Sequence, residues 1–534
     1  MKKGIALVCM LFVGVISFGQ SLKIDWAGKF EYNKEDGYLS EIVGENKTTL
    51  FYKFSDYKIN PLNANGGKLN QKAQIIAIDK VTGTKKKSLK LQGYKENSED
   101  IKNLEYYKAC VLGNNIHVFW RTKREAFQKN SDLYLQTYDT LFTPKSSLKK
   151  IVTVNSASLV EYQPYIHILK NIKSENIRLI VELGLTKKSV VCESYILNNK
   201  SEISKPLKFE FSLNSEDPIN TYPILDFNFL RNEFIVGTGL GKTIVINNLN
   251  TNKYFFNTKI EDKEINSIRY YEDQKGVHFI GSFYINNTKE IKNKKIGLIK
   301  FNFDESTMKV NNYEFIPFSQ DQISKIFYEL PENDEAYILG NKTLVEQKKV
   351  HKNTANFEIV EIIPFNNQIL LTTTKSISFF KYEQFTTTQG VNMVPTTTNH
   401  RFDMIPIIIN ENEIKILDTY KRYDYSHLIA DPKDVISFVD NSYLYSIVGE
   451  NNKYGKNGIR LHYALTNLNT GKIETKYFQI SNPNNRGDLT KFFEYYPLGF
   501  KSEIDNSIYI ITKGETDLMG RDDKSPKHIL KISK

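Results

Sequence analysis

Histidines and acidic clusters are the residues of this chain whose types could do metal or acid–base chemistry. Five histidines, at positions 117, 167, 278, 462 and 528, lie within apolar strand patterns, which is typical of half-buried, hydrogen-bonded side chains. The acidic runs at 332–335 and 522–523 lack the alternating ligand spacing of a calcium loop. No His-Glu-x-x-His, Gly-x-Ser-x-Gly or Cys-x-x-Cys motif occurs. The sequence therefore predicts no metal site, no cofactor and no catalytic residue.

One glycine-rich stretch, Gly237-Thr238-Gly239-Leu240-Gly241-Lys242-Thr243, resembles a phosphate-binding loop. A Walker A loop needs glycine where this chain has Val236. It also needs a helix after the loop, because the helix N-terminus supplies part of the phosphate site. The residues that follow, Thr243 to Ile246, are typical of a strand. We therefore interpret this stretch as a glycine-rich hairpin.

The N-terminus has the pattern of a secretory signal peptide. Lys2 and Lys3 precede an apolar run, and Ser17-Phe18-Gly19 predicts cleavage after Gly19. A lipoprotein anchored through Cys9 is disfavoured because Cys9 lies inside the apolar run and not at its end. No later stretch approaches the roughly 20 apolar residues of a membrane span. The sequence thus predicts a signal peptide over 1–19, no transmembrane segment, and a periplasmic or outer-membrane-associated protein, with an extracellular one as the alternative.

The remaining residues, 20–534, are organised around a repeated hairpin. Its first copy runs from Ala73 to Leu91, and its turn contains Gly83, which can adopt the positive φ of a short loop. Later copies follow at steps of 53 to 59 residues, a spacing that holds four short strands, which we name A to D. Aligned on strand C, the copies begin at Ala73, Asp132, Ser189, Thr243 and Ile296.

Strands B and C of this unit are often apolar on both faces, as in Ile116 to Trp120 and Ile177 to Val181. Such strands need cover on both sides, and a covered, repeated unit of four strands is typical of a β-propeller blade. The chain resembles the propeller architecture in general. Its Asp-x-x-Thr-Gly turn at Asp79 resembles the turns of quinoprotein-type blades, without their tryptophans. We expect an all-β fold, a single β-propeller over 20–534 with roughly eight four-stranded blades, seven and nine also being compatible.

Two regions bear on how the blades are counted. The interval 321–434 fits either one blade or two, with strands expected at Ala336–Leu339, Gln368–Thr373, Ser376–Tyr382, Pro406–Ile409 and Glu413–Leu417. The C-terminus offers strands A, B and C at Phe492–Phe500, Ser507–Thr512 and His528–Ser533, while Leu22–Phe30 is a lone strand. We predict that Leu22–Phe30 supplies strand D of the last blade and closes the ring, because closure removes exposed strand edges. The competing interpretation makes the C-terminus a secretion-sorting domain.

Cysteine usage and net charge give two further expectations. Cys110 and Cys192 lie in apolar strand patterns, which favours buried thiols over a disulfide. The formal charge is +11, of which Lys2 and Lys3 belong to the predicted signal, and the sequence pI is about 9.0. Export argues against a nucleic-acid partner, so the charge suggests an acidic protein surface, an acidic glycan or lipid headgroups. Alternatively, the lysines are scattered over a solvated surface.

The basic residues concentrate in the long connections between strands B and C. The five connections at 56–72, 123–131, 286–295, 451–458 and 514–527 carry charges of +2, +2, +3, +2 and −1. In a four-stranded meander all B-to-C connections lie on one face of the ring, so this face should be basic. The predicted binding residues are Lys123, Arg124, Lys129, Lys292, Lys294, Lys295, Lys453 and Lys456.

Two functional hypotheses follow. The first is a non-enzymatic, exported β-propeller that acts as a protein-interaction platform, an accessory subunit of an envelope, outer-membrane or secretion assembly. Its partner would be a protein with an acidic surface, or else an acidic glycan. The second is a periplasmic or secreted glycan-active enzyme, a hydrolase or lyase, whose carboxylates come from different blades and meet at the channel mouth.

Overall fold

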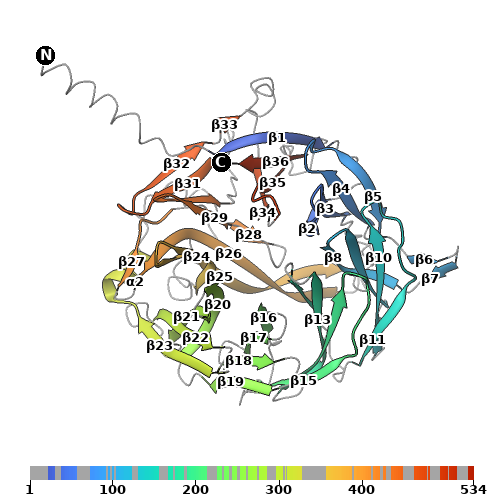
Figure 1. Cartoon of the computed structure of the whole chain (residues 1–534), viewed down its shortest axis with the longest axis horizontal. Helices are drawn as coiled ribbons and strands as arrows, with labels where there is room; N and C mark the ends of the chain where they lie inside the picture. Colours follow the sequence, from blue (N-terminus) through green and yellow to red (C-terminus); the bar gives the residue numbers. More distant parts are fainter. Residues whose placement is uncertain are drawn as a thin grey trace, which may run out of the picture.

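The chain forms a ring of β-sheet blades, which confirms the predicted β-propeller (Figure 1). In the part of the chain that the structure describes, there are six four-stranded sheets and two five-stranded sheets, which gives eight blades, and one two-stranded ribbon. This computed structural model describes residues 22–30, 38–56, 72–91, 94–96, 99–101, 104–122, 130–155, 166–171, 175–185, 189–212, 225–230, 234–239, 243–248, 253–259, 263–273, 276–285, 296–304, 307, 309–326, 356–387, 390–410, 413–420, 425–427, 435–448, 462–477, 479–480, 494–502, 504–513 and 527–533.

Each of the first four blades is an antiparallel meander in chain order, with strands A to D. Blade 1 consists of β2 (Tyr38–Glu45), β3 (Thr49–Asp56), β4 (Lys72–Asp79) and β5 (Lys85–Lys90). The ribbon of β6 (Tyr94–Glu96) and β7 (Glu99–Ile101) follows it. Blade 2 consists of β8 (Leu104–Leu112), β9 (Asn115–Thr122), β10 (Asn130–Asp139) and β11 (Lys149–Asn155). Blade 3 consists of β12 (Ile166–Asn171), β13 (Asn176–Leu185), β14 (Ser189–Asn198) and β15 (Leu207–Ser212). Blade 4 consists of β16 (Leu225–Leu230), β17 (Phe234–Gly239), β18 (Thr243–Asn248) and β19 (Lys253–Lys259).

Blades 5 to 7 repeat the meander, and the short helix α2 (Gln320–Ile326) lies between blades 5 and 6 in the chain. Blade 5 consists of β20 (Lys263–Asp273), β21 (Gly276–Ile285), β22 (Ile296–Asp304) and β23 (Lys309–Pro317). Blade 6 consists of β24 (Asn356–Phe365), β25 (Gln368–Thr387), β26 (Gly390–Ile409) and β27 (Ile414–Ile416), and β28 (Tyr425–His427) also pairs with β26. Blade 7 consists of β29 (Val435–Asp440), β30 (Tyr443–Val448), β31 (His462–Asn467) and β32 (Ile473–Tyr477).

Blade 8 joins the two ends of the chain. Its strands A, B and C are β34 (Glu494–Lys501), β35 (Ile508–Lys513) and β36 (Lys527–Ser533). Its fourth strand is β1 (Lys23–Phe30), which pairs antiparallel with β36, from Lys23 opposite Ser533 to Phe30 opposite Lys527. The predicted closure is therefore confirmed. A short parallel strand, β33 (Gln479–Ile480), covers the outer edge of β1.

The core is distributed between neighbouring blades, as expected from strands that are apolar on both faces. In β9, Ile116, Val118 and Trp120 pack in one cluster with residues of blade 1. Phe119, on the opposite face of the same strand, packs with Ile177 and other residues of blade 3. Side chains alternate along a strand, so each central strand contributes to two interfaces. Blade 2 is thus stabilised by both of its neighbours.

The interval 321–434 contains a single blade in the part that the structure describes, although the sequence allowed two. The segments Gln368–Thr373 and Ser376–Tyr382, expected as separate strands, belong to one continuous strand, β25. The strand expected at 336–339 and the predicted signal peptide, 1–19, lie outside the described residues. Cys110 and Cys192 are buried thiols that are not joined in a disulfide, as expected. None of the described helices is long and apolar enough to cross a membrane.

Candidate functional site

The meander gives the ring two faces with different connections. The A-to-B and C-to-D connections form one face, which we call the turn face. The B-to-C and D-to-A connections form the other, which we call the loop face. On the turn face, two residues separate β8 from β9 and two separate β29 from β30. On the loop face, 15 residues separate β3 from β4 and 13 separate β35 from β36. Room for variable, functional structure is therefore concentrated on the loop face.

On the turn face, side chains at the ends of the C strands organise the C-to-D turns. Asp79 Oδ1 accepts hydrogen bonds from the amides of Val81 and Thr82, at 2.8 and 2.9 Å. Asp139, Asn198 and Asn467 accept equivalent pairs of backbone bonds in blades 2, 3 and 7. Gly83 and Gly471 end two of these turns at φ of 69° and 79°, a conformation that favours glycine. This shared chemistry explains the turn motif of the sequence.

All eight predicted binding residues lie outside the described residues. The strands on either side of them are described, and each pair is a B strand followed by a C strand. The segment with Lys123, Arg124 and Lys129 connects β9 to β10 in blade 2. The segment with Lys292, Lys294 and Lys295 connects β21 to β22 in blade 5. The segment with Lys453 and Lys456 connects β30 to β31 in blade 7.

The loop face also has a feature that the sequence did not predict, a long hairpin made by β25 and β26 of blade 6. Each strand has 20 residues, and they pair from Ile369–Ile409 to Thr387–Gly390. Strand β24 pairs with β25 only as far as Ser376. We call the part beyond this point, residues 377–400, the arm. At about 3.3 Å per residue, its eleven β25 positions span about 35 Å.

The base of the arm coincides with a β-bulge. The register of β25 and β26 shifts between Thr374 and Ser376. A bulge bends a strand and increases its twist, so this position can turn the arm away from the direction of the blade. Just below it, Met404 is fully buried with Tyr420 and Val435. Viewed down the shortest axis, the arm runs from blade 6 across the middle of the ring, towards the side where β8 and β13 lie (Figure 1).

The described carboxyl groups whose pKa values are clearly shifted are all shifted downwards. A general acid at neutral pH needs a carboxyl pKa raised above its usual range. Where the described carboxyl groups have clearly shifted pKa values, hydrogen bonds and nearby lysines lower those values and outweigh any effect of burial. This set is Asp79, Asp132, Asp139, Glu474 and Asp505. Among all the residues that the structure describes, no group of three or more histidine, cysteine or acidic side chains could hold a metal ion.

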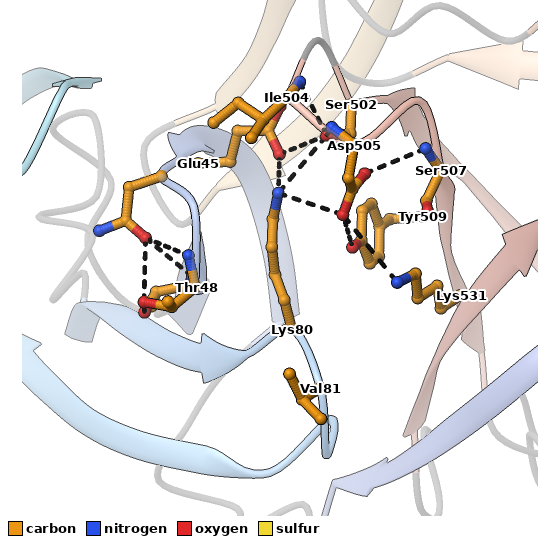
Figure 2. A network of polar contacts seen from close by, with 12 residues as sticks. Glu45, Thr48, Lys80, Val81, Ser502, Ile504, Asp505, Ser507, Tyr509 and Lys531 are labelled. Atoms are coloured by element: carbon orange, nitrogen blue, oxygen red, sulfur yellow. Dashed lines mark hydrogen bonds and ion pairs between the residues drawn. The ribbon is translucent and has the colours of Figure 1, made fainter.

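The most extensive charged network of the described residues lies on the turn face, at the junction of blades 1 and 8 (Figure 2). Lys80, in the C-to-D turn of blade 1, is only 3% exposed. Its Nζ contacts Glu45 Oε2 and lies 3.6 Å from Asp505 Oδ2. Ser502 donates to Glu45 at 2.8 Å, and Tyr509 donates to Asp505 at 2.8 Å. The network therefore joins the first blade to the last.

The electrostatics of this network indicate a structural role. Burial would raise the pKa of Asp505, but hydrogen bonds from Ser502, Ser507 and Tyr509, with the charge of Lys80, hold it at about 2. Burial and the bond to Asp505 raise the pKa of Tyr509. A permanently ionised acid and a protonated phenol do not exchange protons near neutral pH. We interpret the network as a set of ion pairs and hydrogen bonds that stabilises the closed ring.

Comparisons with known proteins show no family for this chain. No protein-family model matches the chain, and no curated protein matches it. Solved structures similar to it include Sqt1 of Saccharomyces cerevisiae, with 10% identity, a TM-score of 0.41, and coverage of 96% of this chain and 100% of that one. An ulvan lyase of polysaccharide lyase family PL25 has 9% identity, a TM-score of 0.37 and 95% coverage of both chains. BamB from Moraxella catarrhalis has 9% identity and a TM-score of 0.32, with coverage of 78% and 85%.

Proposed function

We propose that the protein is an exported, non-enzymatic interaction platform whose loop face docks a protein partner with an acidic surface. The partner would belong to an envelope, outer-membrane or secretion assembly. One observation carries the proposal: five B-to-C connections hold a net charge of +8, while the whole chain without Lys2 and Lys3 has +9. The rest of the surface is then close to neutral, so the charge would orient an approaching partner.

The described structure supports this proposal in two ways. The strands that flank the five connections are B and C strands, which supports a common face for the five connections. The arm extends the B-to-C end of blade 6 and so belongs to that face too. The turn face, in contrast, uses its acidic and amide side chains in its own turns. The predicted residues Lys123, Arg124, Lys129, Lys292, Lys294, Lys295, Lys453 and Lys456 would act collectively, because single exposed lysines contribute little.

Site-specific photocrosslinking in intact cells tests which face meets a partner. A photoreactive residue at Thr122 or Asn130 lies where β9 and β10 meet the loop face, and one at Asn114 or Lys200 lies on the turn face. We expect defined adducts with an acidic envelope protein from the loop-face positions only, and loss of these adducts at high salt. Adducts from the turn-face positions alone would overturn the proposal. Release of shortened chains from an acidic glycan by the purified protein would favour the enzymatic alternative.

A further inference from the structure

The arm leaves one strand edge unpaired in the part of the chain that the structure describes. Beyond Ser376, where the pairing with β24 ends, residues 377–387 of β25 pair with β26 alone. An unpaired edge presents a row of backbone N–H and C=O groups. Another strand can form hydrogen bonds with all of these groups. The second edge of β25 along the arm, unpaired among the described residues, therefore has the backbone groups that an added strand would need.

The register shows which backbone groups point to that edge. Two residues separate Thr387 from Gly390, and a hairpin of this length closes on a pair that exchanges both hydrogen bonds. Counting back from Thr387, the backbone N–H and C=O groups at the odd positions of β25 bond to β26. Those at the even positions, 378 to 386, point to the open edge. The position of Pro395 agrees with this count. It lies opposite Tyr382, where the strand needs no N–H directed towards β25.

The two edges of the arm differ in how they are protected from pairing with another strand. On β26, Pro395 interrupts the outer edge, and β28 pairs with Asn399, His400 and Arg401. Proline and a covering strand are the usual means by which a sheet edge is protected from association. Residues 377–387 of β25 contain no proline. Among the residues that the structure describes, the β26 edge is thus protected and the β25 edge is not.

The sequence of the open edge is complementary to itself. Its eleven positions, 377–387, have Tyr382 at their centre. When two copies pair antiparallel about Tyr382, Lys381 of each lies opposite Glu383 of the other, and Phe379 lies opposite Phe385. Opposite charges and aromatic pairs at facing positions stabilise antiparallel strands. These two pairs occupy the positions without backbone bonds, where facing residues are closest.

We propose that two copies of this chain associate through the β25 edges of their arms, with a two-fold axis at Tyr382. The five even positions of each copy supply the backbone bonds, and the charged and aromatic pairs fix the register. An isologous interface of this kind is self-limiting, because pairing uses the open edge of both arms. The dimer does not depend on the lysines of the B-to-C connections, so failure of this proposal leaves the proposed function standing, and the reverse also holds.

Charge variants of the full exported chain test the register, with sedimentation velocity over a concentration series as the readout. Lys381→Glu alone and Glu383→Lys alone each place like charges opposite one another, and each should raise the dimer dissociation constant about tenfold. The double exchange Lys381→Glu with Glu383→Lys should restore it. Mixing the two single variants should restore it as well, because opposite charges then face each other in the mixed dimer. Absence of recovery in the mixture would overturn the register.

Two further variants test the edge itself. Tyr382→Pro removes an N–H that points to the open edge and leaves the bonds to β26 intact, so it should give a folded monomer. Tyr382→Cys should form an intermolecular disulfide, because facing residues at the axis are within disulfide range. The matched control Gln384→Cys should not, since its own counterpart lies about 13 Å away. A chain that is monomeric throughout, or crosslinking equal at both positions, contradicts the proposal.

Discussion

The turn face and the loop face are built from the same strands but use their polar groups differently. On the turn face, Asp79, Asp139 and Asn198 bond to the backbone of their own turns, and Lys80 is surrounded by partners from blades 1 and 8. On the loop face, long connections carry a net positive charge, and the arm carries a strand edge that has no partner among the described residues. The contrast underlies our proposal that one face stabilises the ring while the other is used for association.

Deleting residues 21–30 should lower the stability of the ring more than any other change proposed here, because it removes β1 and opens the ring. Strand β1 pairs with β36 along its length, and Leu22 is buried in a cluster with residues of blades 7 and 8. We expect the melting temperature, measured by differential scanning fluorimetry, to fall by about 10 °C or more. The exposed residue Lys23 gives the control, Lys23→Ala, which should melt like the wild type. An unchanged melting temperature after the deletion would mean that β1 does not close the ring.

Lys80→Met should be the next most damaging change. It removes the buried cation that contacts Glu45, which is 11% exposed, and that lies 3.6 Å from Asp505. Removing one partner of a buried ion pair costs about 3 kcal/mol of the free energy of unfolding. Urea unfolding followed by fluorescence measures this loss, and the exposed Lys85 supplies the control, Lys85→Met, with little change. Equal unfolding midpoints for the two variants would show that the network does not stabilise the closed ring.

Asp505→Asn should have a smaller and pH-dependent effect. The pKa of Asp505 is lowered from 3.8 to about 2 in the folded chain, so its stabilising contribution is complete above about pH 4 and is lost as the pH falls towards 2. After allowance for partial exposure, the variant should be about 1–2 kcal/mol less stable at neutral pH. Its stability should also change less between pH 4 and pH 2. The exposed Glu314 is the control, and Glu314→Gln should follow the wild type. Parallel pH profiles for Asp505→Asn and the wild type would contradict this role.

The sequence predicted the features that depend on local chemistry and on period. The hairpin spacing predicted the blades, the strand that lacked a neighbour predicted closure by β1, and the Asp79 turn predicted the chemistry that recurs at Asn467. Strands that are apolar on both faces predicted interfaces between blades. These signals are readable because each depends on residues close together in the chain or on a repeat.

The sequence did not predict the arm or the Lys80 network. Lys375 interrupts the apolar pattern of β25, and proline occurs twice in β26, so the pattern favoured several short strands over one hairpin. The sequence offered one sign of the arm: the two residues between Thr387 and Gly390 have the length of a hairpin turn. Lys80 and Ser502 are 422 positions apart and meet only because the ring closes. No local pattern marks such a contact.

The most direct test of the central claim compares two charge reversals that change the net charge equally. One variant replaces Lys292, Lys294 and Lys295 of the blade 5 connection with Glu. The other replaces the exposed turn-face residues Lys200, Lys205 and Lys472 with Glu. Binding to immobilised poly-L-glutamate, measured by biolayer interferometry over a salt series, should weaken about tenfold or more for the first variant and change little for the second. Equal weakening by both variants would mean that the charge acts diffusely, and it would contradict a docking surface on the loop face.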